Sequence, residues 1–332
     1  MNTHAQESAI QLAETIGIRA YVEDLIAAGI GVARIAVESG VSTARLKSWL
    51  AGKEEPDILP PLASWKVETE EASALDSGFV MTPTAQSIVR AFDRARLPKG
   101  HAGKAGNGEI SPRGIALIYG ASGAGKSEAA KWYQHQQNSR RALGSWPVVM
   151  VRCTGVETSQ SRTLGAIIDA MQGAGFYRQT HESKLETIGR HIPPGGLLIF
   201  DEAQLLPLRR MDELRYFPDH CGIALAFMGN MAGYKELVDA KIGQITSRVG
   251  GSRVVIDAPC ENDVDALLDA WEIRGRKVRE LALVIGTQDG GLRKLSDTAS
   301  AARIFAQASS QPVDIDLFKA AALSVGAWGS DA

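Results

Sequence analysis

Residues 120–127 read GASGAGKS, a glycine-rich stretch that fits the phosphate-binding pattern G-x-x-x-x-G-K-[ST]. An apolar run ends directly before the stretch, and the helical segment EAAKWYQHQ follows it. In this setting the glycines let backbone amides point into one hollow, and the helix adds the positive end of its dipole. We expect Lys126 to contact the β- and γ-phosphates of a nucleotide and Ser127 to ligate Mg²⁺. The predicted phosphate-binding residues are Gly120, Ala121, Ser122, Gly123, Ala124, Gly125, Lys126, Ser127 and Glu128.

A second motif, LLIFDE, ends in two acids, Asp201 and Glu202. A buried strand that ends at Asp201 would place this carboxylate beside the metal ion, and Glu202 would polarise the attacking water. Two acids at a strand end also occur as helix N-caps. Downstream of a phosphate-binding loop, the catalytic interpretation is favoured.

Four polar residues further along the chain are candidates for the same site. Asn230 ends the apolar run GIALAFMGN and is predicted to contact the water or the γ-phosphate; the alternative is a plain turn residue. Arg248 and Arg253 precede or begin the last apolar run, and we expect one of them, Arg248 by preference, to reach a neighbouring protomer's nucleotide. Arg293, in GGLRKL, is predicted to reach the nucleotide of its own chain and to couple a lid to the γ-phosphate. Each arginine has the alternative of an ordinary solvated side chain.

The elements that must position these residues follow from the apolar pattern. Five short apolar runs (GIALIYG, VVMVRC, GLLIFD, GIALAFMGN and RVVIDAP) alternate with helical segments, which predicts an α/β fold with a parallel sheet covered on both faces. We expect residues 79–258 to form this core and residues 259–332 a helical lid. Residues 56–78 contain prolines and many acids and are predicted to form an extended linker. The glycine-rich segment 98–112 is predicted to be a mobile insertion.

Residues 1–55 are predicted to form a small all-α domain with a helix-turn-helix. In VARIAVESGVSTARLKSWL, Ala36 is a small residue suited to the point where the two helices cross, and Gly40, four residues later, is suited to the turn. Ser42 is placed to cap the second helix. Polar side chains of that helix would enter a DNA major groove, or the domain would dock another protein. The predicted DNA-binding residues are Thr43, Arg45, Lys47 and Ser48.

Composition limits the other function classes. The chain has 332 residues, 36 basic and 38 acidic, and a net charge of -2, so no global field attracts a polyanion. We expect no membrane partner and a cytoplasmic location, because neither a span nor a signal peptide is evident. The three cysteines, Cys153, Cys221 and Cys260, are far apart and are predicted to be reduced and buried.

The order GASGAGKS, LLIFDE, MGN, SR and G-x-L-R resembles the AAA+ ATPases over about residues 79–310. The segments IAVESGVSTARLKSWLAGK, FVMTPTAQSI and DVDALLDAWEI resemble more narrowly the B-type transposition proteins of Mu-like phages and prophages. This resemblance implies an ATPase that uses ATP and Mg²⁺, forms a homo-oligomer on double-stranded DNA, delivers that DNA to a transposase and stimulates strand transfer in a bacterial host cell. It leaves open whether the assembly is a ring or a helical filament.

Two features depart from this family. The insertion 98–112 is longer than expected, and the acidic motif reads DEAQ, with Gln204 where the Mu type has a further acid. The second departure is expected to affect hydrolysis or γ-phosphate sensing.

Two other functions are compatible with the same motifs. One is a helicase loader or replication initiator, and the other is a nucleotide-gated helix-turn-helix transcriptional regulator. Because the chain is nearly neutral, a single protomer is expected to bind DNA weakly. If the chain assembles on DNA in the presence of ATP, the affinity for DNA would come from the many basic surfaces of the assembly.

Overall fold

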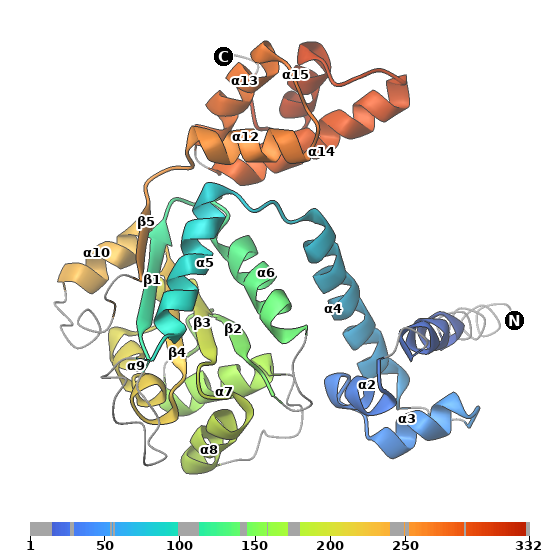
Figure 1. Ribbon diagram of the computed structural model, residues 1–332, viewed down its shortest axis with the longest axis vertical. Helices are drawn as coiled ribbons and strands as arrows, with labels where there is room; N and C mark the ends of the chain where they lie inside the picture. The colour runs from blue at the N-terminus through green and yellow to red at the C-terminus, as the bar shows by residue number, and fades with distance from the viewer. Residues whose placement is uncertain are drawn as a thin grey trace, which may run out of the picture.

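The computed structural model shows three parts: an N-terminal helical unit, a central α/β unit and a C-terminal helical bundle (Figure 1). The residues that it describes are 15–26, 30–53, 55, 57–98, 113–139, 145–157, 159–171, 180–239, 249, 252–288 and 290–329.

The central unit contains five strands in the order β2-β3-β4-β1-β5, and all neighbours are parallel. This confirms the predicted parallel sheet. The strands are β1 (Ile115–Gly120), β2 (Val148–Arg152), β3 (Leu197–Asp201), β4 (Ala224–Gly229) and β5 (Arg253–Ile256).

Helices cover both faces of this sheet, because successive side chains of each buried strand point to opposite sides. In β1, Ile118 packs against α5 (Pro83–Arg96) and α6 (Lys126–Asn138), whereas Leu117 packs into the core on the other face. That second face is covered mainly by α7 (Gln160–Ala170), α8 (His181–His191), α9 (Leu208–Glu213) and the short helix η2 (Phe217–Cys221), with α10 (Met231–Asp239) beside them.

The carboxyl ends of the central strands meet at one edge of the sheet. β1 leads into residues 120–127, β3 ends at Asp201, and β4 ends at Gly229, directly before Asn230. Ligands of open parallel sheets bind at this edge. The sheet order therefore brings together motifs that are far apart in the sequence.

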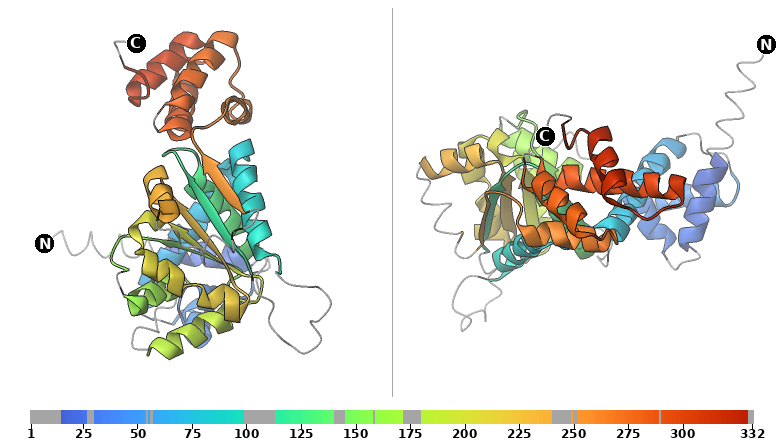
Figure 2. Two further views of the ribbon diagram at one scale, coloured as in Figure 1. Left: turned by 90° about the vertical axis from the view of Figure 1, so that its left-hand side faces the viewer. Right: turned by 90° about the horizontal axis from the view of Figure 1, so that it is seen from above.

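The C-terminal bundle stands beyond this edge (Figures 1 and 2). Its buried core includes Val264, Leu281, Leu295 and Phe318, so each helix contributes to one apolar centre. The helices are α12 (Glu261–Ala270), α13 (Arg276–Thr287), α14 (Gly291–Ser309) and α15 (Ile315–Ser324).

The N-terminal unit has a helical stretch at residues 15–26, followed by α2 (Val32–Glu38) and α3 (Thr43–Leu50). Between α2 and α3 the chain turns at Gly40, whose φ of +70° favours glycine. Ser42 Oγ accepts a hydrogen bond of 3.3 Å from the backbone N–H of Arg45 and caps α3. Leu46 and Trp49 are buried in this unit.

The prediction of an extended linker at residues 56–78 is wrong. Residues Leu59–Gly78 form one helix, α4, which runs from the N-terminal unit toward α5 (Figure 1). Pro60 and Pro61 stand in its first turn, where a missing N–H costs nothing, so they do not break the helix. Leu62 and Trp65 are buried in the N-terminal core, which gives the first half of α4 its tertiary support.

The prediction that all cysteines are buried holds for Cys153, but Cys221 is half-buried and Cys260 is exposed. All three are free thiols. In the described part of the chain, no helix is both long and apolar enough to span a membrane. The predicted insertion at 98–112 lies outside the described residues, except for residue 98.

Candidate nucleotide-binding and catalytic site

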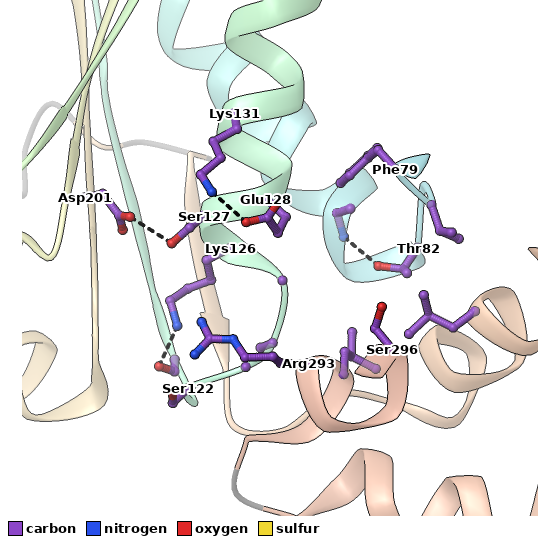
Figure 3. Close-up of a pocket in the computed structure, with 18 of the residues that line it drawn as sticks. Phe79, Thr82, Ser122, Lys126, Ser127, Glu128, Lys131, Asp201, Arg293 and Ser296 are labelled. Atoms are coloured by element: carbon purple, nitrogen blue, oxygen red, sulfur yellow. Dashed lines mark hydrogen bonds and ion pairs between the residues drawn. The ribbon is translucent and has the colours of Figure 1, made fainter. Parts of the chain in front are cut away.

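A pocket of about 870 Å³ lies at the carboxyl edge of the sheet, between the loop at 120–127 and helix α14 (Figure 3). Its walls include Lys126, Ser127, Asp201, Glu202 and Arg293. The structure thus brings together the two sequence motifs and the lid arginine. All the predicted phosphate-binding residues line the pocket, except Ala121, which stands in the same loop.

The loop depends on two glycines with positive φ. Gly123 has a φ of +72°, and a Cβ built there would lie 2.1 Å from the carbonyl oxygen of Gly290, so the loop packs directly against the start of the lid helix. Gly125 has a φ of +81° and is the N-cap of α6, which begins at Lys126. The amino end of α6 therefore faces the pocket and favours an anion there.

The ammonium group of Lys126 lies over the same loop. Its Nζ donates to the carbonyl oxygens of Gly120 at 2.9 Å and of Ala121 at 2.7 Å. Burial lowers the pKa of Lys126, and the positive charge of Arg293 lowers it further. The negative charges of Asp201 and Glu202 raise the pKa of Lys126, but they do not outweigh the effect of burial. A partly desolvated cation that lines the pocket beside the amino end of α6 is suited to bind phosphate.

Ser127 Oγ donates a hydrogen bond of 2.8 Å to Oδ2 of Asp201, joining α6 to the end of β3. Hydroxyl and carboxylate oxygens are ligands that Mg²⁺ accepts, and Mg²⁺ usually takes one or two protein oxygens together with substrate phosphates and water. Among the described residues, no group of three or more His, Cys, Asp and Glu side chains forms a metal cage. The Ser127–Asp201 pair fits a magnesium ion shared with a nucleotide.

Glu202 follows Asp201 in a left-handed conformation, with a φ of 55°. Its backbone N–H donates to Oδ1 of Asp201 at 3.0 Å, and its Oε2 accepts from Nε2 of Gln204 at 2.6 Å. Such a conformation is costly for a residue with a side chain and is concentrated at functional sites. As a result, the carboxylate of Asp201 contacts Ser127, whereas the carboxylate of Glu202 contacts Gln204.

Asn230 lines the pocket, as expected, but its side chain also has a local contact. Its Oδ1 accepts a hydrogen bond of 2.9 Å from the backbone N–H of Gly233, in the first turn of α10. This is the geometry of a helix cap. The side-chain Nδ2 group has the donors that a contact to water or phosphate requires, so the catalytic role stays a prediction.

The predicted arginines are placed unequally. Arg293 extends from the first turn of α14 toward Lys126 and the loop (Figure 3). Arg253 is exposed at the first position of β5, at the end of that strand away from the pocket. Arg248 lies outside the described residues.

The pocket has an apolar end that the sequence motifs did not indicate. It is lined by Phe79 and Val80, before α5, and by Leu267, Trp271 and Leu292 of the lid. The ring of Phe79 also stacks on Trp132 of α6, with centroids 5.2 Å apart. No local pattern distinguishes these residues from ordinary core residues, and only the packing of the lid on the core brings them together.

The predicted DNA-binding residues lie on α3, outside the pocket. Arg45 and Lys47 are exposed, and Thr43 and Ser48 are half-exposed. Arg45 Nε donates to Oε2 of Glu55 at 3.1 Å, so part of its charge is already balanced.

Two family matches cover the core and the lid. Residues 109–236 match the family described as an AAA domain, and residues 247–324 match the C-terminal domain of the Mu B transposition protein.

Similar proteins match most of the chain. The ATP-dependent target DNA activator B of Escherichia phage Mu is 28% identical over 299 residues, which is 87% of this chain and 88% of the relative. The Mu-like prophage FluMu DNA transposition protein B of Haemophilus influenzae is 24% identical over 285 residues, which is 80% of this chain and 89% of the relative.

Among solved structures, the ORC2 protein of Aeropyrum pernix, in ADPNP and ADP complexes, has a TM-score of 0.51 at 16% identity and covers 71% of each chain. The ORC1 protein of the same organism, in complex with DNA, has a TM-score of 0.51 at 18% identity, with 74% of this chain and 66% of that chain covered. At this identity the likeness shows the fold alone.

Proposed function

We propose that this chain, which is similar to AAA domains and to the Mu B transposition proteins, is an ATP-dependent DNA-binding ATPase. It would assemble on duplex target DNA, deliver that DNA to a transposase and stimulate strand transfer. In this proposal residues 1–55 and the first half of α4 form an accessory helical domain, and the second half of α4 joins it to the ATPase core. Residues 79–258 are that core, and residues 259–332 are its lid.

The observation that carries the proposal is the convergence of Lys126, Ser127, Asp201, Glu202 and Arg293 on one pocket. Binding and hydrolysis of a nucleoside triphosphate require these groups together: a cation, a hydroxyl, a pair of acids and an arginine from the lid. The similarity to target DNA activators over 87% of the chain then favours transposition as the process in which the ATPase acts.

In the proposed reaction each residue of the core has a separate task. Lys126 binds the β- and γ-phosphates, and the backbone amides around Gly123 hold their oxygens. Ser127 and Asp201 would hold Mg²⁺, which would supply positive charge to the phosphate oxygens. Glu202 polarises the attacking water and accepts its proton as the new bond to the γ-phosphorus forms, while the bond to the bridging oxygen breaks and ADP leaves with that oxygen. The apolar end of the pocket is suited to the base of the nucleotide.

Two side chains are placed to stabilise the negative charge that develops at the γ-phosphate in the transition state. Arg293 of the lid contacts the γ-phosphate bound by the same chain, and the side-chain amide of Asn230, at the end of β4, donates a hydrogen bond to it. We propose that the arginine from a neighbouring protomer is Arg248 or Arg253, because Arg253 is exposed at the start of β5 and Arg248 precedes it by five residues in the sequence. ATP would thereby join protomers, and hydrolysis would release them.

DNA binding by this chain needs assembly, because a protomer with a net charge of -2 offers little attraction to phosphate. Many protomers along one duplex would add small basic surfaces, so affinity would rise with oligomer size. Lys47 and Arg45 of α3 are candidate contacts, although the ion pair of Arg45 with Glu55 equally suits a docking role for this domain.

The test is duplex DNA binding measured with ATP, with ADP and without nucleotide, together with sedimentation and electron microscopy of the same samples. We expect binding and oligomers only with ATP, and the images distinguish a ring from a filament. Equally tight binding by a nucleotide-free monomer would refute the proposal. The DNA affinities of Lys47→Ala and of the control Lys277→Ala, altered at an exposed lysine of the lid, are then compared. A lower affinity in Lys47→Ala alone indicates that α3 contacts DNA, and equal affinities indicate that the domain docks another protein.

A further inference from the structure

Gln204 connects the acid pair at the end of β3 to the end of β4. We propose that Gln204 is a positioning residue for ATP hydrolysis, which holds the carboxylate of Glu202 in the direction of the attacking water; this inference rests on the proposed ATPase function. Gln204 lies in the short 3-10 helix η1 (Ala203–Leu205), directly after the catalytic acids.

The two hydrogen bonds of the Gln204 amide fix its orientation. Nε2 donates to Oε2 of Glu202 at 2.6 Å, and Oε1 accepts from the backbone N–H of Asn230 at 3.3 Å. A carboxylate can only accept and a backbone N–H can only donate, so one of the two amide orientations satisfies both. Gln204 therefore joins Glu202 to the backbone at Asn230 through a single side chain.

Two glycines leave the space that this side chain occupies. A Cβ at Gly229 would lie 2.5 Å from Oε1 of Gln204, and a Cβ at Gly233 would lie 2.5 Å from its Cβ. Since real Cβ atoms do not approach so closely, the end of β4 and the start of α10 are shaped around Gln204. The amide consequently has little freedom to turn away from Glu202.

Glu202 needs such a partner because its own backbone gives little restraint to its side chain. The residue is half-buried, stands at the N-cap of η1 with a φ of 55°, and its backbone N–H is directed to Asp201. A carboxylate that polarises water contributes only when it lies within hydrogen-bond reach of that water. A misplacement of about 1 Å is enough to cost up to 100-fold in rate. The hydrogen bond from Gln204 supplies the missing restraint.

The test compares Gln204→Met, which keeps the length of the side chain but removes donor and acceptor, with Gln204→Ala and with Gln307→Met. Gln307 is exposed on α14, so its change controls for the substitution itself. We expect kcat for ATP hydrolysis to fall about 10- to 100-fold in both Gln204 variants, with KM, ATP affinity and Tm close to wild type. Gln307→Met should leave all four unchanged.

A double variant identifies the route of the effect. If Gln204 acts through Glu202, single-turnover hydrolysis by Glu202→Gln/Gln204→Met should equal that of Glu202→Gln alone. A full additional loss in the double variant, or a kcat within twofold of wild type in either folded Gln204 variant, overturns the inference. A wild-type chain that binds ATP without hydrolysing it overturns the proposed ATPase itself, and the inference with it.

Discussion

Ser127 and Asp201 are 74 residues apart in sequence, yet the serine hydroxyl donates to Oδ2 of the aspartate at 2.8 Å. The bond is possible because β1 and β3 are parallel strands separated only by β4, so their carboxyl ends meet at one edge. We propose that this hydroxyl and carboxylate would hold Mg²⁺ together with the phosphates of a nucleotide.

Replacing Ser127 by alanine should therefore affect the metal more than the fold. We expect Ser127→Ala to lower kcat about 10- to 100-fold and to raise the Mg²⁺ concentration needed for half-maximal hydrolysis, because a bond to a charged group is worth about 1.5–3 kcal/mol. The measurement is a Mg²⁺ titration of ATP hydrolysis at saturating ATP. Ser87→Ala, at an exposed serine of α5, is the control, and an unchanged Mg²⁺ requirement in Ser127→Ala would exclude the metal role.

We expect nucleotide binding to depend more on Lys126 than on any other residue of the pocket. Lys126→Ala should weaken ATP binding about 100-fold, because charge-assisted bonds to two phosphates are lost together. Calorimetric titration with ATP measures the affinity directly. Lys277→Ala removes an equivalent charge from the lid surface and should bind as wild type does; equal affinity in both variants would show that Lys126 does not contact the phosphates.

Glu202→Gln should separate binding from hydrolysis. The amide keeps the size of the side chain but cannot act as a base, and general-base catalysis contributes about 10²- to 10⁴-fold. We expect ATP to bind normally, hydrolysis to fall by that factor, and the assembly on DNA to persist in ATP. Sedimentation after ATP addition follows the assembly with time, and disassembly at the wild-type rate would contradict the role of Glu202.

The sequence predicted most of this site because its motifs are local. In residues 120–127 the glycines, lysine and serine are neighbours in the chain, and an apolar run before the loop and a helical segment after it confirmed their setting. The apolar runs also predicted five parallel strands, since strands buried on both faces have no polar alternation. The arrangement of motifs in space followed from that sheet.

What the sequence did not reveal depends on contacts between distant segments. Phe79 and Trp271 form the apolar end of the pocket from opposite sides, and each resembles a core aromatic in its own segment. Gln204 acquires its contacts only when η1 packs on the end of β4 and on α10. Helix α4 was missed for a different reason: its prolines stand in the first turn, where they do not stop a helix, and Trp65 gains its burial from the N-terminal core.

Arg293 should make the pocket distinguish ATP from ADP. The side chain comes from the lid and extends toward Lys126, where the γ-phosphate is expected. Arg293→Ala should weaken ATP binding about 10-fold and leave ADP binding unchanged, because only ATP offers the oxygen that it contacts. Affinities for both nucleotides are compared with those of Arg276→Ala, whose side chain is 93% exposed on α13. An equal loss for ATP and ADP would place Arg293 away from the γ-phosphate.

Asp263 fastens the lid to the core. Its side chain is fully buried, and its carboxylate accepts from the backbone N–H of Thr84 at 2.8 Å, from Thr84 Oγ1 at 2.7 Å and from the backbone N–H of Cys260 at 2.9 Å. Burial alone would raise the pKa of Asp263, but the hydrogen bonds from Thr84 and Cys260 outweigh it and lower the pKa below its ordinary value of 3.8. The charged form is therefore the one that the folded chain stabilises.

A depressed pKa in the folded state adds stability above the unfolded value and loses it as the pH falls through the folded value. We expect Asp263→Asn to lower the free energy of unfolding by about 2 kcal/mol at pH 7, and the difference from wild type to shrink below about pH 4. Urea unfolding at a series of pH values measures both. Asp265→Asn, on the same helix, breaks only a surface ion pair with Arg279 and should cost less than about 1 kcal/mol. A difference for Asp263→Asn that stays constant with pH would show that the charge of Asp263 does not hold the lid.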